Sequence, residues 1–185
     1  MLKKFVLLSL MSFSLECLSE EVMVQQILEP TGGKIMKPKN WFYTESQNSS
    51  GYVWTLSKEN VSEKGSYDTG VRIQLLAEVK KGTGKTPEQF ILSFYEEKKK
   101  TVSSVVTTCP VVNQGLFSVI CLETIEFVPF AGGVKKYHIL YSLFWGNNLD
   151  LVVVSVAGTQ ESEWSKYQPI FNKMRAFEII DMSRF

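Results

Sequence analysis

Two β-rich segments close to the C-terminus constrain the fold more than any other feature of this sequence. Residues 137–145 and 149–157 are dominated by aliphatic and aromatic side chains, and residues 146–148, Gly-Asn-Asn, have the composition of a tight turn. Residues 152–154 are three consecutive valines. A strand with one solvent-exposed face would instead alternate apolar and polar residues. We therefore predict an antiparallel pair whose second strand is central in a sheet and covered on both faces.

The rest of the chain supplies further strands and two helices. Thr86-Pro87-Glu88-Gln89 combines an N-cap threonine, a proline at the first helical position and a glutamine that completes a capping box, so a helix is predicted over 86–100. A second helix is predicted over 161–175, with a kink or a restart at Pro169. Further strands are predicted at 41–44, 52–57, 71–79, 102–112 and 116–128, and residues 25–40 are predicted to be an entry strand or loop. Neighbouring hairpins and two helices predict an α+β fold, with helices packed on a mostly antiparallel sheet.

The first nineteen residues have the pattern of a cleavable secretory signal peptide. Lys3 and Lys4 precede an apolar run at 5–15 that is too short to span a bilayer, and small residues at 17 and 19 suit cleavage after Ser19. Acylation of Cys17, as in a bacterial lipoprotein, is the alternative. It is disfavoured because a leucine three residues earlier and a small residue just before the cysteine are both missing. A periplasmic or secreted location is expected.

Cleavage there leaves residues 20–185 as one domain. Residues 1–19 carry two lysines and one glutamate, so a chain of net charge +1 becomes a mature chain of net charge zero. Charges of both signs are interspersed, which gives no basic face for nucleic acid. The richest apolar stretch, 139–157, is interrupted by its turn and by Asp150, so no transmembrane segment is expected in the mature chain.

Two cysteines remain after cleavage. The strands predicted at 102–112 and 116–128 are joined by Asn113-Gln114-Gly115, and pairing them about this turn places Cys109 opposite residue 120 or 121. An oxidising compartment favours a Cys109–Cys121 disulfide. Two separate buried thiols are the alternative, because a register slip of one residue would turn the side chains apart.

Two short motifs resemble catalytic sites but have simpler explanations. Gly84-Lys85-Thr86 matches the end of a phosphate-binding loop, yet the glycine required five residues earlier is Val79, and Thr86 is explained as a helix cap. Asp68-Thr69-Gly70 copies the aspartic-protease triplet, which needs a second carboxylate and a preceding apolar strand. We interpret it as a turn before the strand at 71–79. No catalytic residue is assigned.

His138 is the single histidine of the chain. General-base chemistry would need a nucleophile and an orienting acid close to it, and metal binding would need further ligands. No such motif accompanies it, so a structural place on the sheet is favoured, and neither a metal nor a cofactor is predicted. Trp41 and Trp145 are predicted to anchor the core or, alternatively, to mark a binding surface.

Several motifs together resemble the PsbP-like superfamily. They are Pro38-x-x-Trp41, the helix start at 86–90, the strand Tyr141-Ser142-Leu143-Phe144-Trp145, and the helix Trp164-x-x-Tyr167-x-x-x-Phe171. The resemblance implies an α/β/α sandwich around an antiparallel sheet, acting as a non-catalytic binding or assembly module. Ran, the partner of one nuclear branch, is disfavoured by the signal peptide. No residues match a ligand motif for the calcium or chloride associated with PsbP.

Three functional hypotheses follow. The first is an exported accessory domain that binds another protein or an envelope component, which requires an exposed apolar or aromatic patch. The second is a small hydrolase that uses His138 with a neighbouring Ser and Asp. The third is a small-molecule carrier with a pocket near His138 between sheet and helix.

Overall fold

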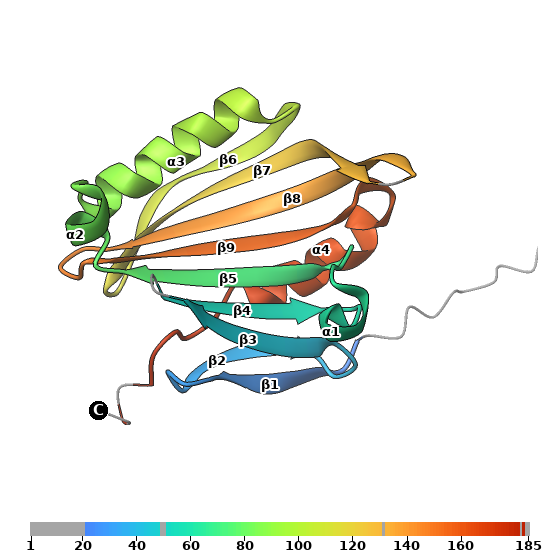
Figure 1. Cartoon of the computed structure of the whole chain (residues 1–185), viewed down its shortest axis with the longest axis horizontal. Coiled ribbons are helices and arrows are strands. Elements are labelled where there is room, and N and C mark those ends of the chain that lie inside the picture. The colour runs from blue at the N-terminus through green and yellow to red at the C-terminus, as the bar shows by residue number, and fades with distance from the viewer. Residues whose placement is uncertain (1–20, 49–50, 131, 182, 184–185) are drawn as a thin grey trace, which may run out of the picture.

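A computed structural model describes residues 21–48, 51–130, 132–181 and 183, and Figure 1 shows its layered arrangement. In this part of the chain a seven-stranded sheet has the strand order β3-β4-β5-β9-β8-β7-β6, and every neighbouring pair is antiparallel. Its strands are β3 Phe42–Asn48, β4 Gly51–Ser57, β5 Gly70–Ala77, β6 Ser104–Gln114, β7 Phe117–Phe130, β8 Gly133–Gly146 and β9 Leu151–Gln160.

The predicted C-terminal strand pair is confirmed and lies at the centre of the sheet. Strand β9 pairs with β8 on one side and with β5 on the other. Val152 and Val153 point to opposite faces and are both almost fully buried. Their burial explains why the valine run does not alternate with polar residues.

Helix α3, Pro87–Thr101, covers one face of the sheet. Its capping box forms as predicted: the backbone N–H of Gln89 donates to Thr86 Oγ1 at 3.2 Å, and that of Thr86 donates to Gln89 Oε1 at 3.0 Å. Ile91 and Tyr95 are buried in one apolar cluster with residues of β7, β8 and β9, including Leu143.

The opposite face is covered by helix α4, Trp164–Met174, and by a two-stranded ribbon of β1, Met23–Leu28, and β2, Gly33–Pro38. A single 3₁₀ turn, η1 Glu161–Glu163, precedes α4, which continues through Pro169. The predicted restart at Pro169 is therefore wrong, since the change of helix type falls at Trp164. Helices on both faces of an antiparallel sheet confirm the α+β sandwich (Figure 1).

Four features were not predicted. The two strands of the ribbon, over 23–38, replace the single entry strand or loop predicted at 25–40. Two short helices, α1 Val61–Lys64 and α2 Val79–Thr83, replace a loop and the end of a strand. The fourth is the C-terminal tail, which returns beside β2. There the N–H groups of Lys34 and Glu178 each donate to the other residue's carbonyl, at 2.9 and 2.8 Å.

The predicted signal peptide, its cleavage at Ser19 and the alternative lipid site Cys17 lie outside the described residues. Within the described part of the chain, no helix combines the length and the apolar character needed to cross a membrane.

Candidate functional site

Cys109 and Cys121 meet in the predicted hairpin. Cys109 of β6 lies directly opposite Cys121 of β7, with their Cα atoms 4.9 Å apart, and the structure joins their sulfurs in a disulfide. Strand β6 is an edge strand whose side chains are almost all exposed. Strand β6 therefore has little side-chain packing of its own, and the disulfide links it covalently to β7, where Cys121 is buried.

His138 has the contacts of a structural residue. Its imidazole stacks on the indole of Trp164, with ring centroids 3.9 Å apart, and its Nε2 lies 2.6 Å from Oε1 of Glu123. The histidine is 8% exposed and points toward α4. These contacts occupy the ring and supply no serine nucleophile, so the arrangement does not support the hydrolase hypothesis.

Trp41 and Trp145 belong to the core. Each is 5% exposed. Trp41 packs against Tyr167 and Phe171 of α4 with ring centroids 6.2 Å away, and Trp145 lies in the cluster beneath α3. The expectation that they mark a binding surface is therefore corrected. Both lie in predicted strands, where a tryptophan can pack in the core or face a partner, so the sequence left both interpretations open.

The two motif-like triplets have the structural roles predicted for them. Thr86 caps α3, and Gly84 ends α2 in the left-handed conformation. Thr69 is buried, and its hydroxyl lies 2.8 Å from that of Thr159 on β9. Asp68 pairs with a lysine rather than with a second carboxylate.

Asp68 is the centre of a polar cluster between the segment before β5 and the start of β8. Lys135 Nζ donates to its carboxylate at 2.8 Å, Gln160 Nε2 donates at 2.9 Å, and the hydroxyl of Tyr137 also donates to it. Burial disfavours the ionised carboxylate, but these three donors outweigh that cost and lower the pKa of Asp68. Burial and the neighbouring carboxylate raise the pKa of Tyr137.

An apolar end of the β7–β8 hairpin projects beyond this cluster. The pairing of β6 with β7 stops at Ile125, whereas β7 and β8 remain paired to Phe130 and Gly133. Four large apolar side chains in this extension are exposed: Phe127 by 56%, Val128 by 41%, Phe130 by 47% and Val134 by 61%. We call these four residues the hairpin tip.

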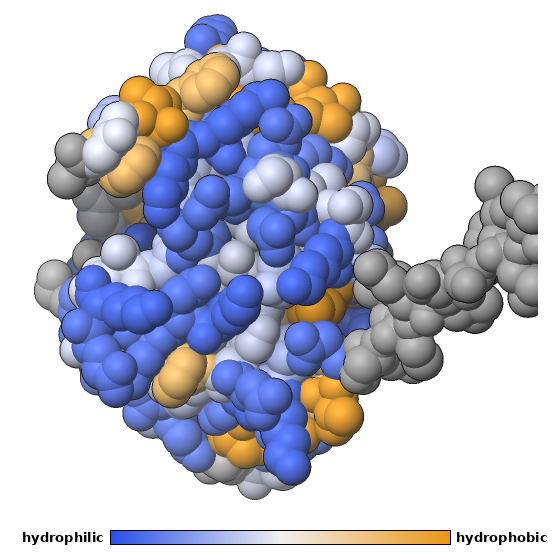
Figure 2. Space-filling model, turned by 90° about the vertical axis from the view of Figure 1, so that its right-hand side faces the viewer, coloured by the Kyte–Doolittle hydropathy of each residue, from blue (hydrophilic) through white to orange (hydrophobic). Residues whose placement is uncertain are grey.

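The hairpin tip is apolar on both faces. Strand alternation places Phe127 and Val134 on the α4 side of the sheet, and Val128 and Phe130 on the α3 side. Figure 2 looks onto the end of the molecule from which the hairpin projects, and shows a mainly hydrophilic surface with hydrophobic residues at its upper margin and others at its lower right.

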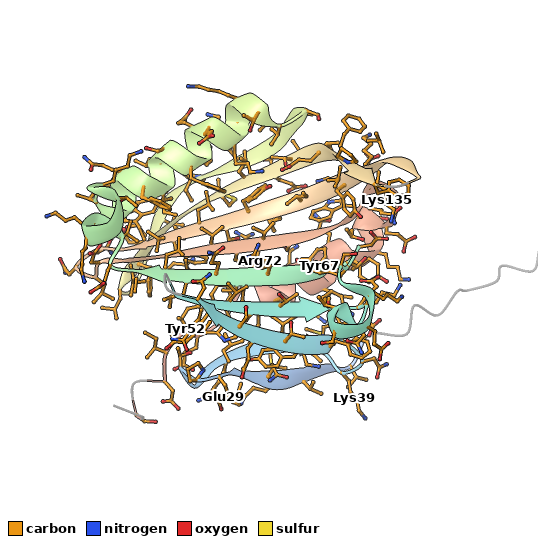
Figure 3. All side chains as sticks on the ribbon, in the orientation of Figure 1. Glu29, Lys39, Tyr52, Tyr67, Arg72 and Lys135 are labelled. Atoms are coloured by element: carbon orange, nitrogen blue, oxygen red, sulfur yellow. A yellow bond between two sulfur atoms is a disulfide. The ribbon has the colours of Figure 1, made fainter. Side chains whose placement is uncertain are left out.

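Ion pairs fix the base of the hairpin on each face. Lys135 pairs with Asp68 on the α3 side, and Lys136 pairs with Glu161 at 2.8 Å on the α4 side. Lys135 also lies over the ring of Phe130, 5.0 Å from its centroid. A cleft of about 400 Å³ opens beside it and is lined by Tyr67, Asp68, Val128, Phe130 and Tyr137 among others. Figure 3 labels Tyr67 and Lys135, which also lines the cleft. An exposed apolar hairpin whose base is fixed by ion pairs, with a cleft beside it, is an arrangement suited to binding a partner.

Sequence reasoning missed this surface. It ended the strand at residue 128 and began the next at 137, so the residues between them had no assigned structure. The run Phe127-Val128-Pro129-Phe130 followed by Gly132-Gly133 was the signal that could have indicated a longer, apolar hairpin.

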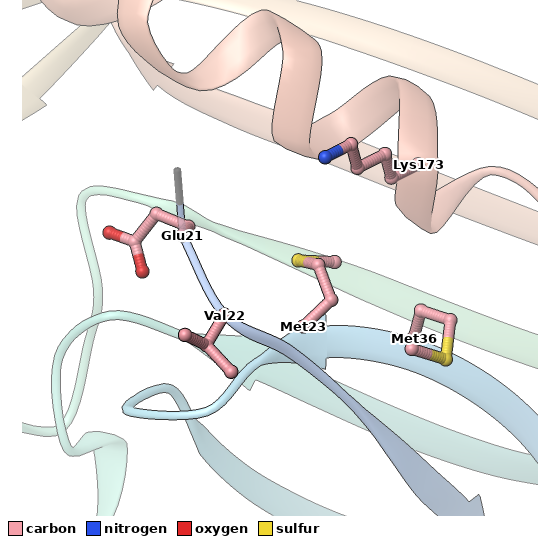
Figure 4. A pocket seen from close by; sticks show the side chains of 5 residues that line it. All are labelled: Glu21, Val22, Met23, Met36 and Lys173. Carbon is pink, nitrogen blue, oxygen red and sulfur yellow. The ribbon is translucent and has the colours of Figure 1, made fainter. Parts of the chain in front are cut away.

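A shallow hollow of about 490 Å³ lies elsewhere, between the β1–β2 ribbon and α4. Figure 4 shows its lining, with Met23 and Met36 on the ribbon facing Lys173 of α4, and with Glu21 and Val22 at the start of the described chain. This lining brings together no set of polar groups that suggests chemistry. Nor does the described part of the chain contain a group of three or more His, Cys, Asp or Glu residues placed to hold a metal ion.

Comparison with known proteins identifies the fold. The solution structure of cyanobacterial PsbP (CyanoP) from Synechocystis sp. PCC 6803 aligns with a TM-score of 0.52 and 12% identity, covering 88% of this chain and 95% of that one. The crystal structure of the Saccharomyces cerevisiae Ran-binding protein Mog1p aligns with a TM-score of 0.51 and 14% identity, covering 89% and 99%. No protein-family model and no curated protein sequence matches this chain. The chain has the PsbP-like fold, as its motifs implied.

Proposed function

We propose that this PsbP-like domain is an exported, non-catalytic accessory domain that binds a protein or another component of the cell envelope through the hairpin tip. The observation that carries the proposal is the set of four exposed apolar side chains, Phe127, Val128, Phe130 and Val134. Large apolar side chains that are exposed together on one projecting hairpin are typical of an interaction site.

The surroundings of the hairpin tip support a protein as the partner. Lys135 and Lys136 are both paired with acids of this chain, so the surface offers apolar contact more than free charge. Interface centres are depleted of charge and enriched in aromatic residues, as here. The cleft beside Phe130 could receive a side chain of the partner. Mog1p, with the same fold, is a Ran-binding protein, and protein binding is therefore compatible with this architecture.

Export is supported by two independent features. The N-terminal pattern is that of a signal peptide, and a Cys109–Cys121 bridge is the covalent link expected of an oxidising compartment. Neither a cofactor nor nucleic acid is needed for the proposed role.

Site-specific photo-crosslinking in the native host tests the proposal. Benzoylphenylalanine is placed at position 127 or 130, and at position 42 as a control, because Phe42 is a similarly exposed phenylalanine on the opposite edge strand β3. We expect one protein adduct common to positions 127 and 130 and absent at 42. Equal labelling at all three positions, or adducts to lipid alone, would contradict a protein partner at the hairpin tip.

A further inference from the structure

A second apolar feature lies at the other end of β8 and β9. There, no helix among the described residues covers the side of the sheet on which α4 packs. Helix α4 covers the His138 end of these strands, and the β1–β2 ribbon lies beside β4 and β5. Near the β8–β9 turn, Phe117 of β7, Phe144 of β8 and Leu151 of β9 share this face and remain only partly buried. Apolar side chains on a sheet face normally lie beneath another layer.

The C-terminal tail forms one wall over this region. Its hydrogen bonds with β2 hold it in place, and Phe177 packs edge-on against Phe144 with ring centroids 5.4 Å apart. Between the tail and the sheet is a pocket of about 440 Å³. It is lined by Gln114, Leu116, Phe117, Phe144, Leu149, Leu151, Val153, Phe177, Glu178, Ile179 and Ile180. This volume is within the roughly 300–1,000 Å³ of small-molecule sites.

The apolar lining of this pocket favours a hydrocarbon ligand over a polar one. Nine of the eleven lining residues are apolar, and the two polar ones, Gln114 and Glu178, are exposed. Among the described residues, every buried side-chain nitrogen or oxygen already has a hydrogen-bond partner. A polar ligand group would therefore lose its hydrogen bonds with water and gain none from side chains inside, whereas a hydrocarbon would lose nothing.

We propose that this pocket binds the acyl chain of a single-chain amphiphile, such as a fatty acid or a lysophospholipid. The chain lies against Phe117, Phe144 and Leu151, and the polar head remains at the mouth, where Leu116 and Leu149 are exposed. The carrier hypothesis thus moves from the neighbourhood of His138 to the opposite end of the strand. This inference is independent of the hairpin tip and of export.

Titration with cis-parinaric acid, a fluorescent fatty acid, tests the pocket in protein purified from its own host after removal of bound lipid. Leu151→Trp fills the pocket. Val111→Trp places the same side chain on the exposed face of β6 and is the matched control. We expect saturable binding that Leu151→Trp weakens by about tenfold or more, that Val111→Trp leaves unchanged, and that lysophosphatidylcholine competes away.

A second variant distinguishes a blocked pocket from a misfolded protein. Leu149 is 37% exposed at the mouth, so Leu149→Glu can be accommodated by the fold while it repels a fatty-acid carboxylate and disfavours an entering chain. Several-fold weaker binding is expected. Non-saturable binding, wild-type affinity in both Leu151→Trp and Leu149→Glu, or displacement by an apolar peptide but not by lysophospholipid would overturn the assignment. The variant Phe127→Ser/Phe130→Ser must retain full binding, which separates this site from the hairpin tip.

Discussion

The imidazole of His138 lies flat against the indole of Trp164, with 7° between the ring planes and 3.9 Å between the centroids. The same imidazole contacts the carboxylate of Glu123 through Nε2. Through this one side chain, β7 and β8 are joined to the first turn of α4. The single histidine of the chain is therefore part of the packing between sheet and helix.

We expect His138→Ala to destabilise the protein by roughly 2–3 kcal/mol, because it removes the stacking contact and leaves the carboxylate of Glu123 buried without this partner. Urea unfolding of His138→Ala, Trp164→Leu and the double variant measures the coupling of the two rings. A coupling of about 0.5–1.5 kcal/mol is expected from stacking. Strictly additive losses would show that the rings do not stabilise each other.

Oxidation of Cys109 and Cys121 should appear as a mass two hydrogens below that of the reduced chain under non-reducing conditions. Reduction should lower the free energy of unfolding by roughly 2–3 kcal/mol, since the bridge closes a short loop and restricts the unfolded chain. The double variant Cys109→Ser/Cys121→Ser should have the stability of the reduced protein. Two free thiols in the purified native protein would contradict the bridge.

Asp68 should make stability depend on pH in the acid range. Its pKa is lowered in the folded state, so its ionised form stabilises the fold above the unfolded pKa, roughly 3.9, and that contribution is lost as the pH falls through the folded value. The side chain is 35% exposed, so solvent screening limits the contribution to about 1 kcal/mol or less.

The measurement for Asp68 compares urea unfolding of the wild type with Asp68→Asn between pH 2 and pH 7, a range of roughly two units below and three above the unfolded pKa. The two curves should converge in acid and separate toward neutral pH. A constant offset across the whole range would show that the loss comes from packing rather than from the charge.

Gly33→Ala should release the C-terminal tail from β2. A Cβ atom at position 33 would lie 2.3 Å from the carbonyl oxygen of Glu178, a contact with backbone that cannot be relieved without moving the tail. We expect a loss of about 1–3 kcal/mol, similar to other overpacked sites, and faster proteolysis of the last residues. Gly82→Ala is the matched control, because a Cβ atom there meets nothing within 4 Å. Equal protease resistance of both variants would contradict this role of Gly33.

The exported protein should begin at Glu20. Intact-mass analysis of the chain from its host measures this directly, and a fatty-acid label tests the alternative in which Cys17 is acylated. Substitution of Ser19 by a bulky residue, Ser19→Trp, should slow cleavage and retain the precursor, because the position before the cleaved bond requires a small side chain. A mature protein that retains residues 1–19 would contradict the signal peptide.

The sequence alone determined the elements whose signals act over a few residues. The valine run at 152–154 indicated the central strand, Thr86 and Gln89 indicated the helix cap, and the turn at 113–115 placed Cys109 near Cys121. Each depends on side-chain alternation, capping chemistry or turn composition, which are local properties.

Only the tertiary structure decided which surfaces are covered. The burial of Trp41 and Trp145, the exposure of Phe127 and Phe130, and the pocket behind Phe177 all depend on where helices and tail pack. The tail meets the β1–β2 ribbon across more than 140 residues of sequence, in contacts such as that of Ile179 with Thr31 of the β1–β2 turn. Short-range patterns carry no information about such a pairing, because the free energy that selects it comes from packing the whole layer. For that reason the strands of the seven-stranded sheet were predictable, whereas the exposure of the hairpin tip and the presence of the pocket were not.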